Sequence, residues 1–107
     1  MNFTEKKLVE ISILIISGDK ETEVTLGIGT PENARCHAYI DGFEEPRRKT
    51  GLSDWEAFFR ALSWLSVRLQ ELERCGYRFA VLDCDPPRHT TALELMHGMT
   101  YVQSTQS

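Results

Sequence analysis

Several features that would point directly to a chemical function are scarce or missing in this 107-residue sequence. There are only three cysteines, Cys36, Cys75 and Cys84, and no two of them are close in sequence. This odd, scattered set predicts reduced thiols rather than a disulfide framework. No apolar run approaches the roughly 18 residues of a membrane-spanning helix, so we expect no membrane contact. The net charge of −4 disfavours a nucleic-acid partner, because like charge repels phosphate.

The N-terminus imitates a secretion signal without completing it. Lys6 and Lys7 precede an apolar run from Leu8 to Ile16. Glu10 interrupts that run, and no small-residue cleavage site follows it. We therefore predict a buried strand here and a cytoplasmic protein.

Composition indicates an ordinary folded domain. Apolar residues make up 41% of the chain and charged residues 26%, which is typical of globular proteins. We find no linker, internal repeat or composition shift, so residues 1–107 are predicted to form a single domain.

Alternation of apolar residues predicts three strands in the first half of the chain. The first runs over residues 8–16, with apolar side chains on both faces for part of its length, as in a central strand. The second covers residues 24–29, and the third covers residues 35–43. Turn residues lie between them at positions 17–20 and 30–33. The simplest arrangement is an antiparallel meander. The charged segment 44–49 that follows is either a solvated loop or an extension of the sheet edge.

The clearest element is a helix from Ser53 to Cys75. Ser53 and Glu56 have the spacing of a capping box, and Gly76 is placed to end the helix. Apolar residues recur at steps of three and four and form the predicted core stripe, namely Trp55, Phe58, Phe59, Leu62, Leu65, Leu69 and Leu72.

A fourth strand and a short helix complete the predicted fold. Residues 77–82 form the strand, which ends before Pro86 and Pro87. Thr91 and Glu94 repeat the capping-box spacing and predict a short helix ending at Gly98. The fold class is therefore α+β: a β-β-β antiparallel meander, a long amphipathic helix packed on the sheet, a fourth strand and a short C-terminal helix.

The sequence contains no set of residues with the spacing of a metal site or a catalytic site. The cysteines and histidines lack metal-ligand spacing, although a Pro-Pro loop could bring Cys84 and His89 together. Cys84 lies between Asp83 and Asp85, whose charges would raise its thiol pKa and make it a poor nucleophile. Those two aspartates could act as a carboxylate pair, but a solvated strand end is favoured. We therefore expect no metal, no cofactor and no catalytic residues.

Two features favour a protein partner instead. Trp64 lies off the main apolar stripe of the long helix, where it either covers the edge of the sheet or stands exposed as a contact residue. Acidic residues collect at the predicted strand ends, where they could steer a basic partner: Asp41, Glu44, Glu45, Asp83 and Asp85.

One segment resembles a known group of proteins. Residues 51–62, GLSDWEAFFRAL, begin with a glycine and a capping residue and continue with aromatics and repeated alanines. Preceded by strands and followed by Leu69, Leu72 and Gly76, this segment resembles the helix signature of small bacterial immunity proteins. Such proteins belong to polymorphic toxin systems such as contact-dependent inhibition and type VI secretion. The resemblance extends over about residues 39–81 and implies a non-enzymatic inhibitor that binds a toxin domain, for example a nuclease, and covers its active site.

Two alternatives stay open at this point. The chain could be a small structural or regulatory subunit, monomeric or homodimeric, that assembles through Trp64 and an uncovered strand edge. Less favoured is an enzyme that uses Asp83, Asp85 and His89 on nucleotides or small metabolites.

Overall fold

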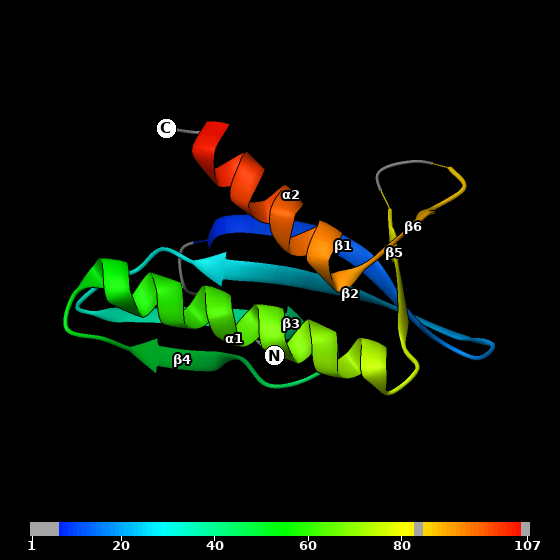
Figure 1. The fold of residues 1–107 in the computed structure, drawn as a ribbon, viewed down its shortest axis with the longest axis horizontal. Coiled ribbons are helices and arrows are strands. Elements are labelled where there is room, and N and C mark those ends of the chain that lie inside the picture. Colours follow the sequence, from blue (N-terminus) through cyan, green and yellow to red (C-terminus); the bar gives the residue numbers. More distant parts are fainter. Residues whose placement is uncertain (1–6, 83–84, 106–107) are drawn as a thin grey trace.

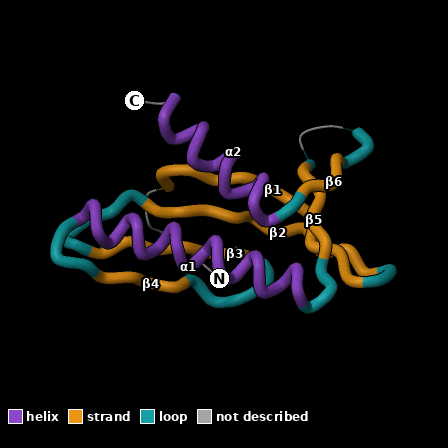
Figure 2. The backbone as a smooth tube through the Cα atoms, in the orientation of Figure 1, coloured by secondary structure: helices purple, strands orange, loops and turns teal. Residues whose placement is uncertain are grey.

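The computed structural model describes the backbone of residues 7–82 and 85–105, and the side chains of residues 8–82 and 85–98. Six strands form one antiparallel sheet in the order β4-β3-β2-β1-β5-β6, and two helices pack on it (Figures 1 and 2). The elements in chain order are β1 (Lys7–Ser17), β2 (Lys20–Gly29), β3 (Arg35–Asp41), β4 (Arg47–Thr50), α1 (Asp54–Arg74), β5 (Arg78–Val81), β6 (Arg88–Thr90) and α2 (Ala92–Thr105).

The predicted meander is confirmed. β1 pairs with β2 and β2 pairs with β3, in both cases antiparallel. The register places Ile13 opposite Val24 and Leu26 opposite Ile40. These side chains therefore share the face that packs into the core, because side chains alternate between the faces of a strand.

The fourth predicted strand is also confirmed, as β5. It pairs with the free side of β1, which makes β1 an internal strand. Two further strands, β4 and β6, extend the sheet at its two edges. Segment 44–49 is therefore part loop and part edge strand, because β4 begins at Arg47.

Both helices lie on the same face of the sheet (Figure 1). α1 packs over β3 and β4, and α2 packs against β1 and α1. Ser53 caps α1 as predicted: its hydroxyl accepts the Glu56 backbone N–H at 3.2 Å, while the Glu56 carboxylate accepts the Leu52 N–H at 3.0 Å. Gly76 follows the helix with a φ of +98°, a left-handed conformation that favours glycine.

Two details of the predicted helices are wrong. Trp55 and Phe59 do not join the core stripe but are exposed on α1. At about 100° per residue they lie on the side of the helix away from Ala57 and Ala61, which are fully buried against the sheet. α2 does not end at Gly98 but continues to Thr105, since a glycine inside a helix weakens it without ending it.

Within the described residues, neither helix has the length and apolar character required to cross a bilayer.

Candidate partner-binding surface

The structure separates the acidic residues that the sequence grouped together. Asp41 ends β3 and Glu45 lies in the β3–β4 loop, both exposed, whereas Asp85 lies in the β5–β6 loop. Three strand spacings, or about 14 Å, separate β3 from β5 in the sheet. Asp41 and Asp85 therefore do not belong to one acidic cluster. Asp83 lies outside the described residues.

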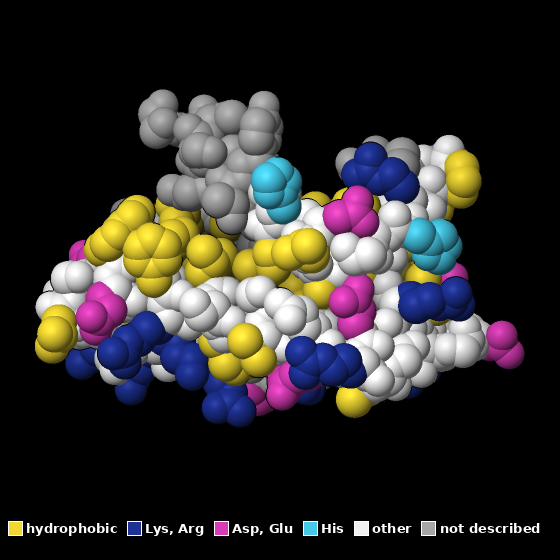
Figure 3. Space-filling view, in the orientation of Figure 1, with side chains coloured by type: hydrophobic (Ala, Val, Ile, Leu, Met, Phe, Trp, Pro, Cys, Tyr) yellow, Lys and Arg dark blue, Asp and Glu magenta, His cyan; other side chains and the backbone are white. Residues whose placement is uncertain are grey.

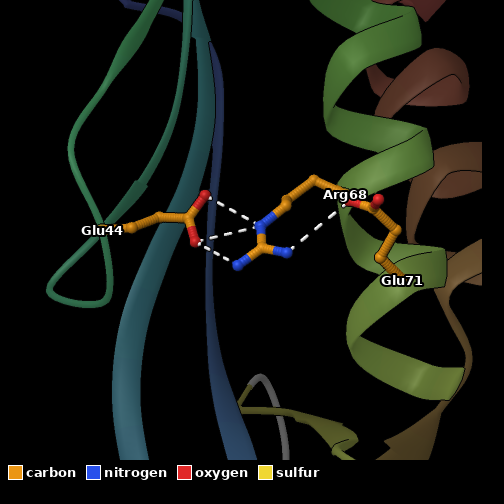
Figure 4. A network of polar contacts seen from close by, with 3 residues as sticks. All are labelled: Glu44, Arg68 and Glu71. Carbon is orange, nitrogen blue, oxygen red and sulfur yellow. Dashed lines mark hydrogen bonds and ion pairs between the residues drawn. The ribbon is translucent and has the colours of Figure 1, made fainter. Parts of the chain in front are cut away.

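Glu44 is engaged by the helix rather than free for a partner. The Arg68 guanidinium from α1 donates through Nε to both carboxylate oxygens of Glu44 at 3.0 Å and through Nη2 to one of them at 2.8 Å (Figure 4). Glu71 adds a longer contact of 3.6 Å to Nη1. The hydrogen bond with Glu44 raises the pKa of Arg68 above its ordinary value, against the opposing effect of burial. Glu44 thus fastens the β3–β4 loop to α1.

Replacement of Glu44 by glutamine is expected to lower the free energy of unfolding by about 1–2 kcal/mol, because a half-buried, bidentate pair is worth more than an exposed one. Glu45→Gln, the same change at the exposed neighbouring residue, should leave stability unchanged within about 0.5 kcal/mol. Urea unfolding of the two variants measures the difference. Equal stabilities would show that the pair contributes nothing.

Trp64 lies between the two placements considered for it, neither fully covered nor fully exposed. It is half-buried and packs against the hydrophobic core at the side of α1 nearest β4. The Arg47 guanidinium carbon lies 5.9 Å from the centre of its ring, within cation–π range. Trp64 therefore covers the edge of the sheet and presents the rest of its ring to a groove.

That groove runs between α1 and β4 and has a volume of about 1,080 Å³. We call it the α1–β4 groove. Its walls are formed by Arg48, Lys49, Thr50, Ser53, Trp55, Glu56, Phe59, Arg60, Ser63, Trp64 and Val67. The one acidic residue among them, Glu56, pairs with Arg60 at 3.3 Å. Lysine and arginine side chains gather along this edge of the molecule, over β4 (Figure 3).

An aromatic cluster lies at the start of α1, on the rim of the groove. Trp55 contacts Phe59 edge to face at 4.7 Å between ring centres, and both contact Phe58 at 5.9 Å. Trp55 is 67% exposed and Phe59 46% exposed, whereas Phe58 is 9% exposed and packs into the core. We call these three residues the aromatic cluster. The signal that could have revealed its exposure is Ala57 and Ala61, since small residues mark the helix face closest to the sheet.

Two further acidic residues, which the sequence pattern did not single out, lie on β2. Glu21 and Glu23 on β2 are exposed. They alternate in step with Thr25, which lies directly opposite Asp41. Because side chains alternate along a strand, Glu21, Glu23 and Thr25 point to the same face of the sheet as Asp41. This is the face that carries no helix. The predicted acidic surface thus continues from Asp41 onto β2 rather than toward β5.

Chemistry-bearing side chains do not converge in the part of the chain that the structure describes. No group of three histidine, cysteine or acidic residues there could hold a metal ion. Cys36 is buried, and its thiol donates to the Gly29 carbonyl at 3.3 Å. His89 is exposed on β6. Cys84, the residue considered together with His89, lies outside the described residues.

Comparisons with protein-family models, with curated proteins and with solved structures found no match to this chain. The α1–β4 groove and the aromatic cluster are therefore assigned as the candidate site from their geometry.

Proposed function

We propose that this chain is an immunity-type inhibitor, which binds a toxin domain of a bacterial competition system in the cytoplasm and covers its active site. The observation that carries the proposal is the aromatic cluster, in which Trp55 and Phe59 stand exposed beside a large groove. The resemblance of residues 51–62 to immunity proteins supports the choice of partner class.

The aromatic cluster has the properties of a binding hot spot. Tryptophan and tyrosine dominate interface energetics, and contiguous exposed apolar patches mark interaction sites. The cluster is also rigid, because Phe58 fixes it to the core and the Ser53 cap holds the first turn of α1. A partner would therefore meet these rings already in place, with little ordering of side chains on binding.

Acidic residues supply a second element of the proposal. Asp41, Glu21 and Glu23 give one end of the helix-free face a negative potential. Because the aromatic cluster lies on the other side of the sheet, this potential would raise the rate of encounter with a cationic partner and would not form part of the contact itself. Glu45 is available for the same role, whereas Glu44 is held by Arg68. A charge-reversal test should therefore change Asp41 and Glu45 and leave Glu44 intact.

Co-expression tests the function directly. A toxin domain captured with the tagged chain is expressed in a sensitive bacterium, with or without the chain. The wild-type chain should restore growth, and the double variant Trp55→Ala/Phe59→Ala should not, because removal of two central aromatics weakens binding by about a hundredfold or more.

The matched control is Leu93→Ala, which removes an exposed apolar side chain from α2, away from the aromatic cluster. It should protect as well as the wild type. Protection by the double variant would show that the aromatic cluster is not the contact surface. Failure of the wild-type chain to protect against any captured protein would refute the inhibitor function itself.

One observation favours assembly as a second candidate function. β4 is one of the two edge strands of the sheet, and its outer side pairs with no described strand. Such an edge can accept a strand from a subunit of a larger assembly. Capture of a permanent protein complex whose activity the chain does not inhibit would favour this alternative.

A further inference from the structure

We propose that β4 binds an extended acidic segment of a partner protein as an added strand, with alternate side chains of that segment entering the α1–β4 groove. The inference rests on the proposed function only in requiring a protein partner, and it holds whether that partner is a toxin or a subunit. It names the chemistry of the segment that the site recognises.

Backbone hydrogen bonding leaves the outer side of β4 open. The Gly51 N–H donates to the Ala34 carbonyl at 3.0 Å, just beyond the paired residues Arg35 and Thr50. In an antiparallel ladder, residues bonded to the neighbouring strand alternate with residues whose N–H and C=O point away from it. Counting back from Gly51, Lys49 and Arg47 bond to β3. The backbone groups of Arg48 and Thr50 therefore point outward, where an added strand can pair with them.

Side-chain alternation defines the two faces that an added strand would contact. Lys49 lies opposite the buried Cys36 and Arg47 opposite the buried Ala38, so both point to the helix side of the sheet. Arg48 points to the other side. One set of side chains on an added strand would therefore face the α1 wall of the groove, with Trp64 and Val67, and the other set would lie beside Arg48.

The charge of this region selects an acidic partner. Arg47, Arg48 and Lys49 follow one another along β4, and Arg60 lies across the groove. Glu56 offsets part of this charge, but its carboxylate is already engaged by Arg60 and the Leu52 N–H. A strand that alternates acidic with apolar residues would place carboxylates beside Arg48. Its apolar side chains would lie against Trp64 and the alkyl stems of Arg47 and Lys49, whose charged ends add to the positive potential of this edge.

Two other occupants are disfavoured. A second copy pairing through β4 would bring two Arg-Arg-Lys runs side by side, and like charges on neighbouring strands destabilise a sheet. A nucleic-acid strand has no peptide groups to bond with the outward N–H and C=O of Arg48 and Thr50, and the chain carries a net charge of −4.

A synthetic peptide tests the inference on the whole chain. The probe is a capped octapeptide that alternates aspartate with valine and phenylalanine, added to the isotopically labelled protein and followed by amide NMR shifts. We expect saturable shifts at Arg48 and Thr50 and at the Trp64 indole. A peptide with lysine in place of each aspartate should bind at least about tenfold more weakly. So should a peptide of the same composition with its aspartates grouped at one end, because it cannot alternate.

Variants of β4 separate strand pairing from charge. Thr50→Pro removes an outward N–H while leaving the bonds of Lys49 and Gly51 to β3, and should abolish saturable binding. Thr50→Ala, its matched control, keeps that N–H and should weaken binding far less than Thr50→Pro does. Arg48→Glu should weaken binding at least about tenfold and leave the fold unchanged, because its side chain is exposed.

Each contrary outcome overturns the inference. Equal binding of the acidic and lysine peptides would show that charge does not select the segment. Wild-type binding by a folded Thr50→Pro variant would show that the segment does not pair with β4 as a strand. Saturable binding of a single-stranded oligonucleotide at the same amides, or a dimer that Arg48→Glu alters, would assign the groove to another occupant. None of these outcomes touches the growth test, so failure of the peptide and failure of the inhibitor function are distinguishable.

Discussion

Replacement of Phe79 by alanine is expected to lower the free energy of unfolding by about 3–5 kcal/mol, because the deletion of a buried ring leaves a cavity that its surroundings fill only in part. Phe79 is 0% exposed and lies in β5, between Ile15 on β1 and Thr90 on β6. A domain of this size has a total stability of roughly 5–15 kcal/mol. Loss of this one ring should therefore bring the protein close to unfolding at moderate temperature.

Phe59→Ala is the matched control, since it deletes the same atoms from a ring that is 46% exposed. Alanine also favours a helix more than phenylalanine does. The loss of the ring contacts with Trp55 and Phe58 should therefore lower stability by only about 1 kcal/mol, far less than Phe79→Ala does. Urea unfolding of both variants measures the contrast. A large loss for Phe59→Ala would mean that the aromatic cluster is a structural element rather than an exposed binding surface.

Strands and helices could be predicted from the sequence wherever burial produces a regular pattern. β1, β2 and β3 alternate because one face of each packs under the helices, and Ile13, Leu26 and Ile40 carry that alternation. The capping residues of α1 were predicted for an equally local reason, since Ser53 and Glu56 bond to backbone groups of their own turn.

The edge strands were not predictable in the same way. β4 reads Arg-Arg-Lys-Thr and β6 reads Arg-His-Thr, and neither contains an apolar residue to alternate. Both become strands because an exposed edge of the sheet offers them partners. Charged residues are also what protects an edge from unwanted pairing. Such strands are therefore assigned by tertiary context alone.

The candidate site was predictable only in part. Trp64 was identified because it lies off the apolar stripe. The exposure of Trp55 and Phe59 was missed because spacing alone places too many aromatics on the buried face of α1. Glu44 pairs with Arg68, which lies 24 positions later in the chain. This pair depends on how the β3–β4 loop packs against α1, so no local sequence pattern predicts it.

Gly27 is required by a tertiary contact that could not be predicted from the sequence. Two glycines, Gly27 and Gly29, lie in β2, and the structure gives the reason for Gly27. The Tyr39 ring on β3 lies over Gly27, and a Cβ atom added at Gly27 would overlap the end of that ring. Tyr39 is 2% exposed, and its hydroxyl donates to the Glu10 carboxylate at 2.8 Å.

Gly27→Ala is accordingly expected to lower the free energy of unfolding by about 1–3 kcal/mol, because the ring must be displaced from a packed position. Tyr39 also offers a spectroscopic readout. Burial, and then the hydrogen bond with Glu10, raise the pKa of Tyr39 well above its ordinary value near 10. A raised folded-state pKa contributes stability that is fully present below pH 10 and is lost as the pH rises above it.

Tyrosinate absorbance during an alkaline titration should therefore separate the two proteins. In the native wild type, Tyr39 should not ionise in the ordinary tyrosine range. In Gly27→Ala the displaced phenol should lose its burial and its hydrogen bond with Glu10, so it should ionise closer to pH 10. Because the neutral phenol is then less strongly favoured by folding, the variant should also lose less stability than the wild type as the pH rises above 10.

Double-mutant cycles test whether the Tyr39 ring causes the destabilisation by Gly27→Ala. If Gly27 matters because the ring of Tyr39 occupies its Cβ position, the cost of Gly27→Ala should persist in a Tyr39→Phe background, which keeps the ring. In a Tyr39→Ala background the cost should vanish and give way to a gain of about 0.5–1 kcal/mol, because alanine in a strand is better than glycine by that amount. An equal cost in both backgrounds would show that Gly27 is required for its backbone rather than for the ring that lies over it.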